Sequence, residues 1–318
     1  MKKRVSVFCI LAAGCLWGMI GVFVRMLSSY GINSMQLTFL RSLVTVFSVV
    51  TFTFLTDPSK LRVRRRDLWC FAGSGICSIV FFNFCYFQAI RLTSLSVAAI
   101  LLYTAPMIVT VLSAVLFHER ITVRKAVALA LAFLGCALVS GVTGGAASVS
   151  ATALLFGLGS GFGYALYSIF GHYALKRYDS LTVTAYTFLF SSAGCVPLLN
   201  LPPLFRTAFS SPGIILTVVV FGIVTSAVPY VLYTYGLNHV ETSHASIIAS
   251  VEPVTATVIG IIFYHETVSA ASAAGSLLVL AAVFLLNGKT REEKKNFPAE
   301  AGRKAENAAG GQTGGTRS

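Results

Sequence analysis

A single carboxylate stands inside one of the most apolar stretches of the chain, directly before a proline. The stretch VEPVTATVIGIIFYHE spans residues 251–266, which places Glu252 about ten residues, or roughly 15 Å, into an apolar run that begins near residue 243. A charged carboxylate in hydrocarbon costs at least about 2.5 kcal/mol, so it has to face a cavity, find a partner or hold a proton. We interpret Glu252 as a contact for the ammonium group of a ligand or as a proton-binding site. The alternative is a protonated carboxyl that bonds to neighbouring backbone and steadies a kink.

Three prolines predict interruptions in otherwise continuous apolar helices, namely Pro106, Pro229 and Pro253. A proline has no N–H to donate, so Pro106 and Pro253 deprive the carbonyls of Leu102 and Ala249 of their usual partners. Within a membrane such a carbonyl is tolerated only against protein or a water-filled cavity. We expect these prolines to kink their helices around a central site. Kinks that serve only packing are the alternative.

Other polar and aromatic side chains fall within the apolar stretches. Arg41 either extends its long side chain outward to the membrane surface or pairs with a ligand or another residue. Asn83 lies midway along an apolar run, where an amide lacks water unless a cavity is present. Ligand pockets are mostly apolar and aromatic, with a few polar groups that fix orientation. In addition to Glu252, the candidate substrate-binding residues are therefore Arg41, Asn83, Trp17, Tyr103, Tyr164, Tyr230 and Tyr233. For each aromatic residue among them, membrane anchoring or core packing is the alternative.

Membrane-spanning helices have to position these residues. The 318 residues are 56% hydrophobic and only 11% charged, with a mean hydropathy of +0.79, whereas a soluble domain carries about 25% charged residues. A helix needs roughly 20 apolar residues to cross a bilayer. This criterion predicts an all-α polytopic membrane protein with ten transmembrane helices, at about 5–26, 33–56, 68–90, 94–117, 124–142, 151–175, 180–200, 213–237, 243–264 and 268–287. The polar segment 289–318 is expected to be a disordered cytosolic tail.

The basic residues predict how the chain lies in the membrane. Lysine and arginine are retained on the cytosolic side of membrane proteins. With the N-terminus in the cytosol, 20 of the 24 Lys and Arg residues fall on the cytosolic side, three outside (Arg25, Arg91 and Arg206) and one, Arg41, within a span. The net charge of +13 therefore reflects topology, and nucleic acid is not an expected partner. We expect a multi-pass protein of the cell membrane, with both termini cytoplasmic.

The chain repeats itself at a constant offset of 147 residues. Identical pairs include Gly14 with Gly161, Pro106 with Pro253 and Glu119 with Glu266. Five spans per copy require the second copy to enter the membrane from the opposite side, and the loop charges agree. The segment DPSKLRVRRRD between spans 2 and 3 is basic, whereas its counterpart between spans 7 and 8 holds only Arg206. The sequence thus predicts two inverted five-helix repeats, 1–142 and 148–288, an arrangement found in many secondary transporters.

With GCLWG at 14–18, a proline followed by His-Glu at the end of span 4, and VEP followed by His-Glu in span 9, the body 5–288 resembles the drug/metabolite transporter superfamily, specifically its EamA-type members. That resemblance implies a transporter of small organic solutes such as amino acids, related metabolites or toxic compounds, commonly in the export direction. Alternating access at a midplane site between the repeats is the expected mechanism. Protons are a further candidate partner. A lipid or amphiphile flippase, or another lipid-handling membrane protein, is the alternative.

No motif of a soluble enzyme, of a metal site or of a cofactor site is recognisable in the sequence. Nucleophile elbows, HExxH and phosphate-binding loops are missing, and the loops are too short to hold a catalytic domain. Glu119 and Glu266 each follow a histidine, but two ligands are too few for a metal. We expect contacts at helix ends for these two pairs. His239, Glu241 and His244, at the start of span 9, are candidates for lining a gate.

Overall fold

The computed structural model describes residues 2–93, 95–139, 150–264 and 269–287 and is helical throughout this part of the chain. In the first half the helices are α1 (Lys2–Gly18), α2 (Ile20–Ser28), α3 (Ser34–Thr56), α4 (Leu68–Ala72), α5 (Phe81–Leu92), α6 (Leu95–Leu102), α7 (Ala105–Phe117) and α8 (Val123–Val139). In the second half they are α9 (Ala151–Leu175), α10 (Ser180–Cys195), α11 (Leu201–Ala208), α12 (Pro212–Gly222), α13 (Val228–Leu237), α14 (Thr242–Ala249), α15 (Glu252–Tyr264) and α16 (Ala270–Asn287). The predicted tail, 289–318, and the pair His265–Glu266 lie outside the described residues.

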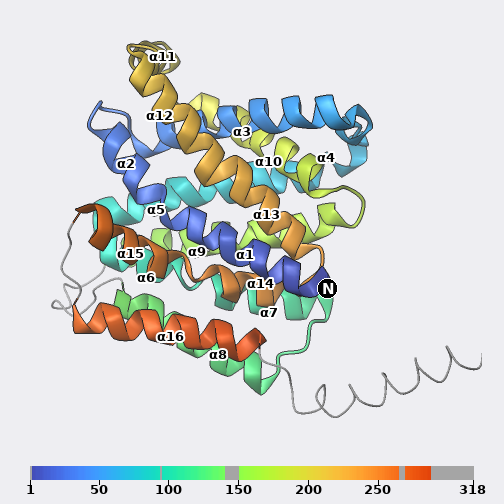
Figure 1. The fold of residues 1–318 in the computed structure, drawn as a ribbon, viewed down its shortest axis with the longest axis vertical. Coiled ribbons are helices and arrows are strands. Elements are labelled where there is room, and N and C mark those ends of the chain that lie inside the picture. The colour runs from blue at the N-terminus through green and yellow to red at the C-terminus, as the bar shows by residue number, and fades with distance from the viewer. Residues whose placement is uncertain (1, 94, 140–149, 265–268, 288–318) are drawn as a thin grey trace, which may run out of the picture.

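These helices make ten membrane-spanning units. Eight units in the described part of the chain are long and apolar enough to cross a bilayer, several of them assembled from two to four consecutive helical elements. The other two are α8 and α16, of 17 and 18 residues, which lie side by side along one edge of the molecule (Figure 1). The all-α architecture of ten transmembrane helices in two inverted repeats is therefore confirmed. Short 3-10 turns at Pro58–Leu61, Arg65–Asp67 and Val196–Leu198 lie in the connections.

Local signals in the sequence fix where the helices begin. The Asn33 side chain accepts from the Gln36 amide at the start of α3, and the Gln36 side chain accepts from the Asn33 amide in return. Ser150, Asp179 and Ser211 cap α9, α10 and α12 through side-chain oxygens in the same way. Such caps satisfy amides that have no partner inside the helix. The connections can therefore be short, and the spans pack directly against one another.

The packing of the helices obeys an approximate two-fold symmetry. Helix α1 of the first repeat packs on α13 of the second, and its counterpart α9 of the second repeat packs on α5 of the first. Likewise α1 packs on α14 and α15, while α9 packs on α6 and α7. The pairs α3 with α10 and α8 with α16 join equivalent helices of the two repeats. Each repeat therefore completes the core of the other, and the interior lies between them.

Interruptions of the helices also repeat. The break between α6 and α7 covers Tyr103 and Thr104, and the break between α14 and α15 covers Ser250 and Val251, 147 residues later. The spans that contain α5 and α13 each include a π-helical segment, at Gly73–Val80 and Ile223–Ala227 respectively. π-helical turns commonly mark functional sites. The irregular backbone thus concentrates at matching depths on both sides of the interior.

The loops divide between two faces. We call the basic face the one formed by the start of α1 and the loops at 57–67, 118–122, 176–179 and 238–241. Contacts across it include Arg177 Nη1 to Asp67 Oδ1 at 2.8 Å and Lys60 Nζ to Asp179 Oδ2 at 3.2 Å. The Arg124 Nε atom donates to Leu285 O at 2.6 Å, so α16 ends at the same face. Loops 29–33 and 199–211 lie on the opposite face, and the second of these connections contains α11.

Candidate functional site

A cavity of about 600 Å³ lies between the two repeats. Its walls come from α1, α2, α3, α5, α6 and α8 of the first repeat and from α9, α12, α13 and α15 of the second. Side chains from helices far apart in sequence therefore meet in one place. Seven of the eight predicted substrate-binding residues line it, namely Trp17, Arg41, Asn83, Tyr103, Tyr164, Tyr230 and Glu252.

The predicted residue Tyr233 does not line this cavity. Its hydroxyl hydrogen-bonds to the Ser168 hydroxyl at 2.8 Å, and its ring packs 5.3 Å from the ring of Trp17. Tyr233 is buried behind the wall, with 3% of its surface exposed. Tyr233 therefore supports the Trp17 ring from behind the cavity wall.

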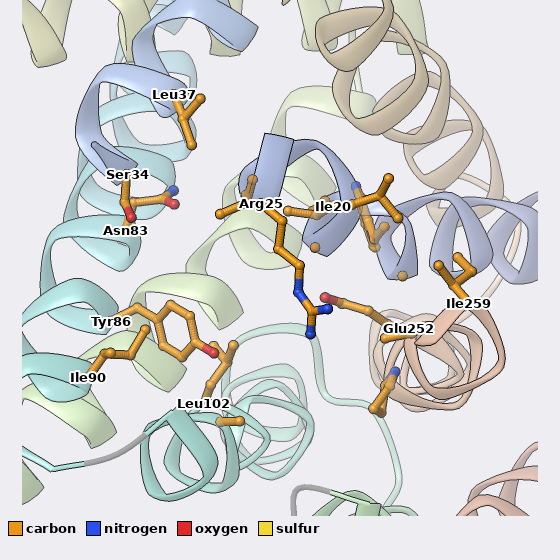
Figure 2. A pocket seen from close by; sticks show the side chains of 18 of the residues that line it. Ile20, Arg25, Ser34, Leu37, Asn83, Tyr86, Ile90, Leu102, Glu252 and Ile259 are labelled. Atoms are coloured by element: carbon orange, nitrogen blue, oxygen red, sulfur yellow. The ribbon is translucent and has the colours of Figure 1, made fainter. Parts of the chain in front are cut away.

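The cavity extends from the middle of the bundle toward the face opposite the basic face. Its outer rim is formed by Arg25 in the last turn of α2, Ser34 at the start of α3, Ile90 near the end of α5 and Tyr264 at the end of α15. In Figure 2 the Arg25 side chain extends from α2 into the pocket, between the wall that carries Tyr86 and the wall that carries Glu252 and Ile259. Its guanidinium lies over the Tyr264 ring, at the rim. The deep end is formed by the two helix breaks, through Tyr103 and Glu252.

Glu252 is the first residue of α15, immediately after the break at Ser250 and Val251. The break exposes the carboxylate to the cavity, so the side chain is half-buried rather than enclosed. The Tyr164 hydroxyl and the Arg41 guanidinium both act on this carboxylate. A chamber of about 10 Å³, room for about one water molecule, continues beneath it, beside Ser246 and Ser250.

Arg41 is directed inward, so the interpretation of an outward-extended side chain is wrong. It is 5% exposed and lines the cavity together with Leu37 and Thr38 from the preceding turn of α3. Its Nε atom is buried without a hydrogen-bond partner among the described residues. A buried cationic donor without a partner is costly to maintain, which is typical of a binding site.

Trp17 is the centre of an aromatic cluster in the cavity wall. Its ring lies 5.0 Å from the ring of Tyr230 and 6.4 Å from that of Tyr164, both edge-to-face. The indole Nε1 atom is buried and has no hydrogen-bond partner within the described part of the chain. The cluster therefore offers aromatic faces and one unused donor.

Asn83 satisfies its amide within its own helix. The Nδ2 atom donates to Ile79 O at 2.7 Å, at the end of the π-helical segment Gly73–Val80. A π-helical turn disturbs the regular backbone pattern and leaves carbonyls for side chains to bind. The amide therefore lines the cavity and also stabilises the irregular helix beneath it.

The three predicted kink prolines lie at the start of helical segments. Pro106 and Pro253 are the second residues of α7 and α15, directly after the two breaks, and Pro229 is the second residue of α13, after a π-helical segment. A first-turn position requires no N–H from proline. Pro253 also lines the cavity.

Arg25 is a cavity residue that sequence reasoning missed, because it was counted among the outer loops. Its guanidinium carbon lies 4.3 Å from the centre of the Tyr264 ring. The signal that would have found it is helical spacing, since Trp17, Gly21 and Arg25 recur every fourth residue and all line the cavity.

On the basic face, the two repeats are joined through one carboxylate. Glu119, after α7, accepts hydrogen bonds from the Thr242 amide at 2.8 Å, the Ser243 amide at 3.3 Å and the Ser243 hydroxyl. Lys125 Nζ lies 3.4 Å from Glu119 and 2.5 Å from Glu241, which also pairs with His244. The first repeat thereby caps the N-terminus of α14 in the second.

The electrostatics of Glu119 favour this closed arrangement. Burial by itself raises the pKa of Glu119, but the hydrogen bonds from Ser243 and Thr242 and the charge of Lys125 together hold that pKa below its ordinary value. The carboxylate is therefore ionised at neutral pH. The expected helix-end contact of Glu119 is confirmed, and Glu241 and His244 join it. His239, in the turn after α13, instead bonds to Tyr235 O in the last turn of that helix.

Comparison with known proteins identifies the group to which this fold and cavity belong. The model of the EamA-like transporter family matches residues 4–141 and, a second time, residues 151–288. The chain belongs to the EamA-like transporter family. The family resemblance of the motifs is therefore confirmed, and the chain is a multi-pass membrane protein of a transporter family, with a small solute and the lipid bilayer as partners.

Several relatives align over nearly their whole length. An uncharacterized transporter of Archaeoglobus fulgidus is 31% identical over 284 residues, covering 87% of this chain and 94% of the relative. A Streptantibioticus cattleyicolor protein with the name "Probable terminal-alkyne amino-acid exporter" is 25% identical, covering 91% and 96%. A crystal structure with a TM-score of 0.73 covers 89% of this chain and 96% of its own at 19% identity, which shows the shared fold.

Potential metal ligands do not cluster in the described part of the chain. Within the described residues, no group of three or more His, Cys, Asp or Glu side chains is placed to hold a metal ion. Within the same residues, none of the seven cysteines forms a disulfide.

Proposed function

We propose that this EamA-like protein is a secondary transporter that exports a small organic solute, an amino acid or related metabolite, by alternating access. The observation that carries the proposal is the cavity between the repeats, which reaches one face and is closed toward the other by Glu119. A site of this kind in the middle of the bundle, at the interface of inverted repeats, is where secondary transporters bind their solutes.

The basic face lies in the cytosol, since it holds the loops rich in lysine and arginine. Arg62, Arg64, Arg65 and Arg66 lie in one connection on this face, and Lys176 and Arg177 lie in another. The structure then represents an outward-open state, with the cavity continuous with the exterior. Export ends in this state, because the solute leaves through the open rim.

The transition to an inward-open state follows from the repeat symmetry. The two repeats have equivalent breaks, at Tyr103–Thr104 and Ser250–Val251, which allow the half-helices to tilt separately. Releasing Glu119 from the start of α14 opens the basic face. Closing the rim around Arg25 and Tyr264 completes the exchange, as one bundle rocks against the other.

The dimensions and chemistry of the cavity favour a small, water-soluble cargo. A volume of about 600 Å³ is within the range of roughly 300–1,000 Å³ typical of small-molecule sites. The walls come from both repeats, and charged groups lie deep inside, which favours a soluble solute over the acyl chains that a flippase moves. The name of the Streptantibioticus relative, an amino-acid exporter, supports the same class.

Proton coupling through Glu252 is a second proposal. Glu252 is the one acidic residue among the described residues that line the cavity, and it lies at the deep end of the cavity, in the middle of the bundle. In proteoliposomes, Glu252→Gln should abolish the response of solute flux to an imposed pH gradient. A variant that still transports and still responds to the gradient like the wild type would refute this coupling.

Solute counterflow tests the transport proposal itself. Purified protein in liposomes preloaded with a mixture of unlabelled amino acids and other polar metabolites is exposed to trace amounts of each labelled compound. Transient accumulation of at least one compound, dependent on the protein, is the expected result. Accumulation of none, together with protein-dependent movement of labelled phospholipid between leaflets, would favour the flippase instead.

A further inference from the structure

We propose that the cavity recognises a zwitterion at two points: Arg41 binds an anionic group, a carboxylate in the case of an amino acid, and Glu252 binds an ammonium group. This inference rests on the proposed transport function and adds the feature of the solute that is recognised, its two opposite charges, and the residue that binds each charge. It starts from the charges that line the cavity. In the described part of the chain they are Arg25, Arg41 and Glu252.

Arg41 meets the requirements of an anion site. It is 95% buried, its Nε atom has no hydrogen-bond partner among the described residues, and no carboxylate there lies within 4 Å of its guanidinium. A guanidinium presents a planar fork of donors that matches a carboxylate through two parallel hydrogen bonds. An anionic group in the cavity would complete its hydrogen bonding.

Glu252 meets the requirements of a cation site. It begins α15 at the deep end of the cavity, and it forms no ion pair with the described residues. The rings of Trp17, Tyr164 and Tyr230 line the same region. Aromatic faces around a carboxylate favour an ammonium group through cation–π attraction in addition to the ion pair.

The two charges are close but not in contact. Arg41 acts electrostatically on Glu252, yet their nitrogen and oxygen atoms do not come within the 4 Å of an ion pair. Tyr230 lies within electrostatic range of both groups. In an α-amino acid a single carbon joins the ammonium and the carboxylate, so one small molecule can bridge such a pair and satisfy both charges. A solute with only one charge would leave the other buried group uncompensated, which is the basis of discrimination.

Arg25 is assigned a different place. Its guanidinium stacks on Tyr264 at the rim, 4.3 Å from the ring centre, nearer the exterior than Glu252. The carboxylate of a bound solute therefore binds Arg41, within the cavity wall. Arg25 lies on the path by which the solute leaves.

Binding of three related probes tests the inference on the full-length protein in detergent. Each of the twenty common amino acids is first measured by its effect on thermal unfolding. The tightest binder is then compared with its decarboxylated amine and with the acid that lacks the amino group. The wild type should bind the amino acid roughly 10- to 100-fold more tightly than either derivative, as expected for the loss of one charge-assisted contact.

Two variants separate the two contacts. Arg41→Gln should remove the preference for the amino acid over its amine while retaining the preference over the acid. Glu252→Gln should do the reverse. Arg206→Gln, an exposed arginine in α11 outside the cavity, serves as the control that should change neither preference. Arg41→Lys, which keeps the charge but loses the fork, covers the case in which Arg41→Gln fails to fold.

The outcomes distinguish this inference from the proposed function. Equal loss of affinity for all three probes in both variants would overturn two-point recognition. Counterflow of a solute that is not a zwitterion, with no binding of any amino acid, would also overturn it while leaving transport intact. Counterflow of no solute at all would refute the transport function first.

Discussion

Gly14 and Gly161 occupy equivalent positions in the two repeats, and each lies against a break in a neighbouring span. A Cβ atom on Gly14 would lie 3.0 Å from the Ala249 carbonyl and 2.7 Å from Val251 Cγ1. A Cβ atom on Gly161 would lie 2.9 Å from the Leu101 carbonyl, 3.3 Å from the Leu102 carbonyl and 2.6 Å from Thr104 Oγ1. The Ala249 and Leu102 carbonyls receive no helical hydrogen bond, because Pro253 and Pro106, four residues later, have no N–H to donate. The two glycines therefore let α1 and α9 approach the irregular backbone that forms the deep end of the cavity.

Gly161→Ala should destabilise the protein, because its methyl group has to displace backbone as well as a side chain. Overpacking of this kind costs about 1–3 kcal/mol, which exceeds the gain of up to about 1 kcal/mol from replacing glycine in a helix. Thermal unfolding in detergent measures the effect. Gly213→Ala is the matched control, since the nearest atom to its Cβ would be Ser211 Oγ at 3.9 Å. An unfolding temperature for Gly161→Ala equal to that of the control would contradict the close packing.

Loss of Glu119 should open the basic face. Glu119→Ala removes the acceptor of two amides and one hydroxyl at the start of α14, and Glu119→Gln retains one acceptor oxygen. An unsatisfied buried donor costs about 1–3 kcal/mol, so the rate of amide exchange near residues 242–249 should rise roughly 10-fold or more in Glu119→Ala. The exchange rate in Glu119→Gln should lie between those of the wild type and Glu119→Ala. Hydrogen–deuterium exchange followed by mass spectrometry measures this. Lys60→Ala, which removes an exposed ion pair on the same face, should leave α14 unchanged.

The same carboxylate predicts a pH dependence with a definite sign. A carboxyl whose pKa is lower in the folded than in the unfolded state stabilises the folded arrangement above the unfolded pKa, and this stabilisation is lost as pH falls through the folded pKa. The pKa of Glu119 is lowered by its contacts. The exchange difference between wild type and Glu119→Gln should therefore persist from pH 7 to pH 5 and shrink only below the ordinary glutamate range, about 4.3. Lys125, Glu241, His172 and His244 surround the site, so only this difference, and not the absolute rate, reports on Glu119. Disappearance of the difference already near pH 6 would rule out the assignment.

Trp17→Phe should weaken solute binding while leaving the fold intact. The substitution keeps the ring in its cluster but removes the indole donor, which has no partner among the described residues. One hydrogen bond to a ligand is worth roughly a factor of 2 to 10 in affinity. Trp69, the other tryptophan of the chain, is 52% exposed and packs on Phe170 outside the cavity, which makes Trp69→Phe the control. Equal affinities in the two variants would exclude Trp17 from direct contact.

The sequence was sufficient for the fold because its signals are long and mutually consistent. Apolar runs of membrane length, an ungapped 147-residue repeat and inverted loop charges each indicate the same ten helices in two repeats. Glu252 was recognisable because a carboxylate in an apolar run has few stable environments. The short helix α11 was missed, since eight residues in a connection carry no membrane signal.

The site was predictable in composition but less so in orientation. Arg25 was assigned to a loop because its role depends on the precise end of α2, and helix ends are the least certain feature of a sequence. Tyr230 and Tyr233 lie on one helix three residues apart, yet Tyr230 lines the cavity and Tyr233 faces Ser168. The π-helical segment Ile223–Ala227 just before them alters the helical phase, and no residue pattern in the sequence revealed it.

Thiol labelling of a residue inside the cavity tests most directly whether a solute passes between the repeats. Thr257 lines the cavity on α15, and a cysteine there, with the seven native cysteines replaced, can be labelled in oriented proteoliposomes by a membrane-impermeant maleimide. Without solute, labelling should be fast from the face opposite the basic face and slow from the basic face, and a transported solute should protect the cysteine. Equal labelling from both faces, or no protection by a solute that the protein transports, would contradict a passage between the two repeats.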